Sequence, residues 1–435
     1  MAEADAAITR AAALAPTDPG IAFFLAMLRF ERGLPAASLF AAAQGLDPAS
    51  PDVLKNHALA LAAEGEANAA EALLAAALAG RPGWLEGQRV LASLRWTRGD
   101  AAAAVAGFAA AVRGEPANPG LWLGWFGHLA QRRDWAGAGA VLAEARAALG
   151  ETRALAVAAA FLAEESGARD EAARRLRDLA AVADPFLDLT RIRHALRGGD
   201  AARAAAIAEP LTATPLAGQV WPYLSAAWRL TGNPRARWLD GDPPFVATID
   251  TGIPASELAE LAAVLRTLHT ARQAYGEQSV RGGTQTDRSL LLRHEPALEA
   301  LRERLLRHVA DFVAALPPPD PTHPLLSRAH APLRIAGSWS VRLAAQGYNV
   351  VHSHPLGWIS SAFYVALPPP QTRGAAPAGW LELGGAPPEL GLPLEPWARI
   401  EPVPGRLVLF ASTLWHGTVP FADGERLAVA FDVVT

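Results

Sequence analysis

Hydrophobic residues follow two different periods along this chain, and the change falls near residue 238. Before it, apolar residues recur at helical spacing in short segments bounded by glycine or proline. Two such segments, with Gly99 between them, make up GWLEGQRVLASLRWTRGDAAAAVAGFAAAVRGEP (83–116). Glycines expected in turns of this kind recur at intervals near 33 residues or a multiple of 33, at Gly33, Gly65, Gly99, Gly167, Gly199 and Gly232. This period predicts about seven stacked helix–turn–helix units, an α-solenoid, over residues 1–238.

The repeat resembles the tetratricopeptide repeat. In the unit at 83–116 the expected aromatic, leucine, turn glycine and small residues stand at Trp84, Leu91, Gly99, Ala103 and Phe108. The fourth unit departs from the pattern, because it has no turn glycine. Solenoids of this kind offer a concave face on which a peptide or protein can bind. We therefore expect a peptide or protein partner there, with homodimerisation or a purely structural role as the alternatives.

From residue 239 to residue 435 the apolar residues alternate at a shorter period and become β-branched and aromatic. Two helical patterns remain, at 256–272 and 296–316. Strands are predicted in RIAGSWSVRLA, YNVVHSHP, WISSAFYVALP, GWLEL, GRLVLFAS and RLAVAFDVV. Short strands with turns rich in glycine and proline predict a β-barrel or sandwich. The expected boundary between the two domains lies between residues 235 and 245, and we place it at 238/239.

The composition narrows the functional classes. The 435 residues are 51% hydrophobic and 19% charged, which is typical of a folded chain with more than one domain. A net charge of −4 provides no electrostatic case for nucleic-acid binding. The absence of cysteine excludes disulfides and thiolate ligands. Neither a basic signal-peptide start nor a membrane-length apolar run is visible, so we expect a cytoplasmic protein without a membrane partner.

The candidate metal-binding and anion-binding residues lie in the second domain. His352 and His354 stand two residues apart in GYNVVHSHPLGWIS, and in a strand that spacing points both side chains to one face. His416 follows in STLWHGTVPF, and Arg426 opens the last apolar strand. A charged side chain in such a strand either reaches solvent or holds a buried anion.

These segments resemble the iron(II)- and 2-oxoglutarate-dependent oxygenases, whose fold is the double-stranded β-helix or jelly roll. The resemblance runs through RGGTQT (281–286), SW (338–339), HSHPLGWISSAFYVALP (352–368) and PGRLVLFASTLWHGTVPFADGERLAVAF (404–431). The last segment carries the most specific spacing, which prolyl-hydroxylase-like members also show. The resemblance implies that His352 and His416 are iron ligands. It also implies that Arg426 pairs with the far carboxylate of 2-oxoglutarate and that Tyr364 donates a hydrogen bond to it.

One position departs from the usual pattern of the superfamily. Where most members have a carboxylate two residues after the first histidine, this chain has His354. A subgroup of the family shares this His-x-His form, which implies a three-histidine iron site. The alternative, a site with only two protein ligands, stays open, and imidazole sites also bind copper and zinc tightly.

The resemblance implies Fe(II), 2-oxoglutarate and molecular oxygen as cofactors. Combined with the repeats, it predicts hydroxylation of an amino-acid side chain in a peptide or protein. Arg281, Thr284, Gln285 and Trp339 are candidates to contact the substrate, although the first three could belong to a turn and Trp339 to the core. The rival hypotheses are a three-histidine zinc or copper enzyme, and a repeat-based binding protein whose jelly roll has no activity.

Overall fold

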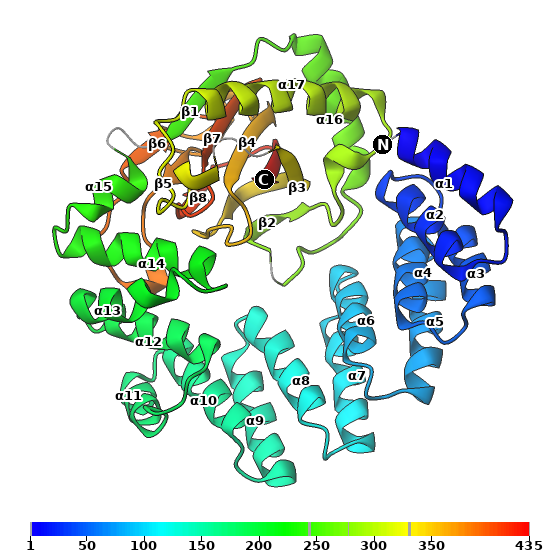
Figure 1. Ribbon diagram of the computed structural model, residues 1–435, viewed down its shortest axis with the longest axis horizontal. Coiled ribbons are helices and arrows are strands. Elements are labelled where there is room, and N and C mark those ends of the chain that lie inside the picture. Colours follow the sequence, from blue (N-terminus) through cyan, green and yellow to red (C-terminus); the bar gives the residue numbers. More distant parts are fainter. Residues whose placement is uncertain (1, 242–244, 277, 329–331, 435) are drawn as a thin grey trace. The chain divides into compact units, whose positions relative to one another are not determined.

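The computed structural model describes residues 2–241, 245–276, 278–328 and 332–434. The predicted boundary region extends over residues 242–244, which lie outside the described residues. The first half of the chain is helical (Figure 1). Its helices are α1 (Ala2–Leu14), α2 (Pro19–Glu31), α3 (Ala37–Leu46), α4 (Pro51–Ala63), α5 (Ala67–Gly80), α6 (Leu85–Thr97), α7 (Ala101–Gly114), α8 (Pro119–Gln131), α9 (Trp135–Leu149), α10 (Arg153–Glu165), α11 (Arg169–Asp178), α12 (Pro185–Arg197), α13 (Ala201–Leu211), α14 (Ala217–Leu230) and α15 (Arg235–Asp240).

After α1, the described helices of this half form seven consecutive pairs, α2–α3 to α14–α15, which confirms the predicted helical repeat. Six of the turns within these pairs contain one of the predicted glycines, each with a positive φ, as at Gly99 with φ 93°. In the fourth pair Arg133 takes this place with φ 59°, a conformation that strains a residue with a Cβ. The left-handed turn is therefore kept even where glycine is missing.

The chain divides into two compact units by its internal contacts. One unit comprises Met1–Ala158, Ala271–Glu277 and Leu292–Glu299, and the other comprises Ala159–Thr270, Gln278–Leu291 and Ala300–Thr435. The last helix pairs thus belong to the same unit as the strands. The predicted domain boundary at 238/239 lies within α15, and β1 (Val246–Asp250) is the first strand after it. As a statement about independently folding domains, that boundary stays a prediction.

Two antiparallel sheets build the second half of the chain. The larger has the order β1-β7-β4-β9-β3-β2 and the smaller β6-β5-β8. After β1, their strands are β2 (Val280–Gln285), β3 (Arg334–Asn349), β4 (Ile359–Ala366), β5 (Leu381–Leu383), β6 (Ala398–Ile400), β7 (Arg406–Ala411), β8 (His416–Thr418) and β9 (Arg426–Val434). Strands far apart in sequence are neighbours in this order, as the predicted jelly-roll class requires.

Two helices lie beside the larger sheet (Figure 1). α16 (Ala255–Leu268) packs against β4, and α17 (Pro296–Ala314) lies beside α16, with Arg304 paired to Glu257 at 2.8 Å. The remaining helical elements are short: η1 (Leu290–Leu292), η2 (Leu326–Arg328), α18 (Pro370–Arg373) and η3 (Pro388–Leu390). None of the helices in the described part of the chain has the length and apolar character needed to span a bilayer.

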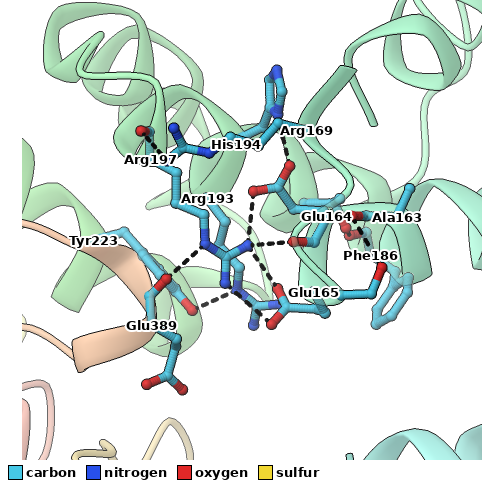
Figure 2. Close-up of polar contacts among 12 residues, drawn as sticks. Ala163, Glu164, Glu165, Arg169, Phe186, Arg193, His194, Arg197, Tyr223 and Glu389 are labelled. Carbon is cyan, nitrogen blue, oxygen red and sulfur yellow. Dashed lines mark hydrogen bonds and ion pairs between the residues drawn. The ribbon is translucent and has the colours of Figure 1, made fainter. Parts of the chain in front are cut away.

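Within the second unit, a buried ionic cluster ties α10, α12 and η3 together (Figure 2). The Glu164 side chain is fully buried and accepts hydrogen bonds from Arg197 at 2.7 Å and from His194 at 2.6 Å. Arg197 also pairs with Glu165 at 3.3 Å and donates to the Glu389 carbonyl at 3.0 Å. These helices are thereby fastened to η3, which lies between β5 and β6.

Candidate metal centre and cosubstrate pocket

The backbone brings the three histidines together from two segments. YNVVHSHP was expected to be a continuous strand, and this expectation was wrong: β3 ends at Asn349, and His354 lies outside every strand. His352 instead forms an isolated antiparallel bridge with His416, in which each N–H donates to the other's carbonyl at 2.9 and 2.8 Å. The His354 N–H donates to Ser412 O at 3.0 Å. Pairing with the 412–416 segment therefore aligns all three rings.

The three rings face one another. Their centroids are 4.2 Å apart for His352 and His416, 5.0 Å for His352 and His354, and 4.9 Å for His354 and His416. One ring nitrogen from each lies within 4.8 Å of the others, close enough for a single metal ion. The sequence prediction that His354 converges with the other two is thus met in geometry, although its ligation stays a prediction.

Each ring is oriented by a hydrogen bond from its Nδ1. His352 Nδ1 lies 2.8 Å from Val350 O, and His416 Nδ1 lies 3.0 Å from Leu414 O. His354 Nδ1 lies 2.6 and 2.8 Å from the two carboxylate oxygens of Asp432. Because carbonyl and carboxylate oxygens only accept, Nδ1 must carry the proton in each ring, and Nε2 keeps the lone pair that binds metal.

Burial keeps the imidazoles of His352 and His416 neutral at pH 7. It lowers the pKa of His352 to about 4, with a further contribution from neighbouring His354. Burial, followed by the neighbouring His352 and His354, lowers the pKa of His416 well below its usual value. Neutral imidazole is the metal-binding form, so the folded chain presents these ligands ready for a divalent ion.

A buried cation with two unpartnered nitrogens also lines the pocket. Arg426 at the start of β9 is 4% exposed, and its Nε and Nη1 have no hydrogen-bond partner among the described residues. Its guanidinium carbon lies 5.1 Å from the ring centroid of Tyr364, whose hydroxyl is also buried without a partner. Burial lowers the pKa of Arg426 and raises the pKa of Tyr364. A guanidinium and a phenol left open in this way fit an anionic group such as a carboxylate.

Alternate side chains of the paired strands β3 and β9 form the floor of the pocket. Trp339, Val341 and Leu343 of β3 pair with Ala430, Ala428 and Arg426 of β9, and all six line the pocket. The three histidines line it as well, as do the polar residues Ser279, Asn349 and Thr418. Asn349 donates to Ser279 Oγ at 3.0 Å from its amide nitrogen, and its backbone N–H donates to Thr418 Oγ1 at 2.8 Å. An apolar floor with a few polar groups is typical of a small-molecule site.

Of the four residues expected to contact substrate, only Trp339 lines the pocket, with its ring 5.4 Å from that of His354. Thr284 lies opposite Arg342 in the sheet and contacts His269 Nδ1 at 2.8 Å. Arg281 donates to the carbonyls of Gln278 and Val280, and Gln285 pairs with Val341 at the edge of the sheet without lining the pocket. The structure does not bring Arg281, Thr284 or Gln285 to the histidines.

Sequence reasoning overlooked Asp432 and its partners. Asp432 lies six residues after Arg426 on the same face of β9 and opposite Ser360 of β4. Ser360 Oγ donates to Asp432 at 2.7 Å and contacts Ser412 Oγ at 2.8 Å. The signal was available, because the argument that drew attention to Arg426, a charge in an apolar strand, applies equally to Asp432.

The fold and the site together define a jelly-roll protein with a three-histidine cluster and an anion-binding arginine in one pocket. Residues 337–432 match the family model described as "Putative 2OG-Fe(II) oxygenase". This match covers the three histidines, Tyr364 and Arg426, and it ends at Asp432. The C-terminal part of the chain is therefore a domain of the 2-oxoglutarate- and iron(II)-dependent dioxygenases. The donor set fits their metal, and the open guanidinium fits 2-oxoglutarate.

Solved structures similar to this chain fall into two groups. A viral collagen prolyl hydroxylase from Paramecium Bursaria Chlorella virus-1, in complex with 2OG, is 13% identical, with 44% of this chain and 97% of that chain covered and a TM-score of 0.30. A Pseudomonas putida prolyl-4-hydroxylase is 17% identical over 43% and 91%, with a TM-score of 0.30. A tetratricopeptide repeat protein from Parabacteroides merdae is 18% identical over 46% and 81%, with a TM-score of 0.34. No curated protein matches this chain.

Proposed function

We propose that this protein hydroxylates an amino-acid side chain of a peptide or protein that its helical repeats recruit. The oxygenase domain identifies the class of reaction, and the repeats motivate the choice of substrate. The observation that carries the proposal is the pocket that three clustered histidines line together with Arg426, two of whose guanidinium nitrogens have no partner.

Each residue of the pocket has a task in this proposal. His352, His354 and His416 would hold the metal through Nε2, and Arg426 with Tyr364 would hold the far carboxylate of 2-oxoglutarate. Bound iron(II) and 2-oxoglutarate supply the oxidising chemistry with molecular oxygen. Phe410, with its ring 4.7 Å from His416, and Trp339 border the cluster with apolar surface and so limit the access of water.

Support for a peptide or protein substrate comes from the repeat architecture. Helix pairs joined by left-handed turns build a solenoid, and solenoids bind extended chains on one face. This support is an analogy of architecture, and the residue that is modified is not specified by it.

The test begins with anaerobic titration of the metal-free protein with Fe(II) and 2-oxoglutarate. We expect the metal-to-ligand charge-transfer band of the loaded site in the wild type and its loss in His416→Ala. Peptides captured by His416→Ala are then incubated with the wild type, Fe(II), 2-oxoglutarate and oxygen. Succinate release and a gain of one oxygen atom in a captured peptide, seen by mass spectrometry, are the expected results.

Three outcomes contradict the proposal in different ways. Hydrolytic activity with zinc and no succinate with any substrate would favour the zinc enzyme. A wild-type biological activity in His416→Ala would favour the repeat-based binding protein. Succinate release coupled only to small molecules would keep the oxygenase and remove the peptide substrate.

A further inference from the structure

The three histidines of the cluster are oriented by unequal partners. For His352 and His416, the Nδ1 acceptor is the backbone carbonyl two residues earlier, Val350 O or Leu414 O. The corresponding carbonyl for His354 is His352 O, which already accepts the N–H of His416 at 2.8 Å. His354 turns instead to the side chain of Asp432 on β9. Two ligands thus have neutral acceptors and one has a charged acceptor.

Hydrogen bonds hold the Asp432 carboxylate in position for its contact with His354. Its carboxylate accepts from His354 at 2.6 and 2.8 Å and from Ser360 at 2.7 Å, and its side chain is 15% exposed. Ser360 is itself fixed by Ser412 at 2.8 Å, and the two serines are buried. Among the described residues, Asp432 has no ion-pair partner other than His354. A carboxylate placed this way gains a compensating charge when a metal cation binds the far nitrogen of the imidazole.

We infer that Asp432 is a positioning residue that restores, through His354, the negative charge missing from the metal's own ligands. In a site with two histidines and one carboxylate, a divalent ion and its ligands carry a net charge of about +1. Three neutral imidazoles leave about +2, and Asp432 brings the sum back to about +1 from one hydrogen bond further out. The Asp432–His354 bond also fixes the ring so that Nε2 points at the other two histidines. This inference rests on the metal centre of the proposed function.

Cobalt(II) binding to the metal-free full-length protein provides the test, because it needs no substrate and no turnover. Asp432→Asn keeps the size and an acceptor oxygen but removes the charge. We expect its Kd for cobalt to rise about 10- to 100-fold, the range that loss of such a partner produces. The matched control is Asp250→Asn, which removes the same charge from an exposed site on β1 paired with Arg406. Its Kd should stay within about threefold of the wild type.

A double-mutant cycle distinguishes an effect of Asp432 on cobalt binding that passes through His354 from a direct long-range effect of its charge on the metal. In the His354→Ala background, Asp432→Asn should change the cobalt Kd by less than about threefold, because the bond that transmits the charge is gone. The Fe(II)–2-oxoglutarate charge-transfer band gives a second readout. Asp432→Asn should shift it to shorter wavelength, since a ligand that donates less electron density leaves the metal electrons lower in energy. Asp432→Ser serves as a second variant if Asp432→Asn does not fold.

The results can overturn the inference without touching the proposed function. A cobalt Kd within threefold of the wild type in a folded Asp432→Asn protein would remove any role for the carboxylate. An equal change in the presence and absence of His354 would show that Asp432 acts only as a distant charge. If His352→Ala and His416→Ala bound cobalt as tightly as the wild type, the metal centre itself would be wrong.

Discussion

Two buried arginines in the same unit of this protein have opposite surroundings. Arg197 donates to Glu164, Glu165 and the Glu389 carbonyl (Figure 2). Arg426 has two guanidinium nitrogens with no partner, although it is also buried, with 4% of the residue exposed. Removing a charge from water costs several kcal/mol unless other groups replace the water. Arg197, whose partners are protein groups, therefore has a structural role. Arg426, which has nitrogens without a protein partner, is available to bind a ligand.

The largest effect should come from breaking the paired cluster. Glu164→Ala removes a fully buried acceptor from the buried Arg197 side chain and from the partly exposed His194 ring. The free energy of unfolding should therefore fall by about 3–5 kcal/mol. Urea denaturation followed by circular dichroism measures it. Glu395→Ala, in an exposed pair with Arg399, is the control and should cost less than about 1 kcal/mol. Equal losses in both variants would mean that burial does not distinguish the two pairs.

Removing the open arginine should affect binding instead of stability. In Arg426→Met the Kd for 2-oxoglutarate should rise at least about 30-fold, because truncating a buried partner of a charge costs about 2 kcal/mol or more. Without 2-oxoglutarate, the free energy of unfolding should stay level or rise, since an unpaired charge leaves the interior. Calorimetric titration and urea denaturation measure the two quantities, and Arg406→Met on β7 is the control for binding. A strongly destabilised Arg426→Met protein with unchanged affinity would reverse the comparison.

Acid should destabilise the pocket before metal is added. His352 has a folded pKa of about 4 and an ordinary unfolded pKa near 6.5, so between these values the unfolded chain binds more protons. Its contribution to stability is complete above pH 6.5 and is lost as the pH falls toward 4, by about 1.4 kcal/mol per pH unit. His352→Gln should flatten the pH dependence of the unfolding free energy by that slope. Parallel curves for the two proteins would show that His352 titrates normally.

The smallest effect concerns backbone strain in the repeats. Arg133 has a positive φ at a turn where six other repeat turns have glycine. Arg133→Gly should raise the unfolding free energy by about 0.5–1 kcal/mol, because glycine adopts this conformation without a Cβ clash. Gly99→Ala, the converse change, should lower it by a similar amount. Thermal unfolding of both variants checks this, and cobalt and 2-oxoglutarate binding should not change in either.

Local rules were sufficient for much of this protein. Helical spacing and turn glycines predicted the repeats, since each helix pair is formed by residues close together in the chain. The spacing of His352, His416 and Arg426 was informative because it matches a family pattern. The expected strand around His352 and His354 failed, because partners 60 residues later decide whether an extended segment joins a sheet.

The order of residues alone established the helical period, the change to strands and the residue types able to bind a metal and an anion. The folded arrangement was needed to see that Asp432 meets His354, that two nitrogens of Arg426 have no partner, and that Thr284 contacts His269. The physical reason is that these contacts join strands distant in sequence, where register selects the facing pairs. Hydrogen bonding and desolvation then depend on all the neighbours of a group at once.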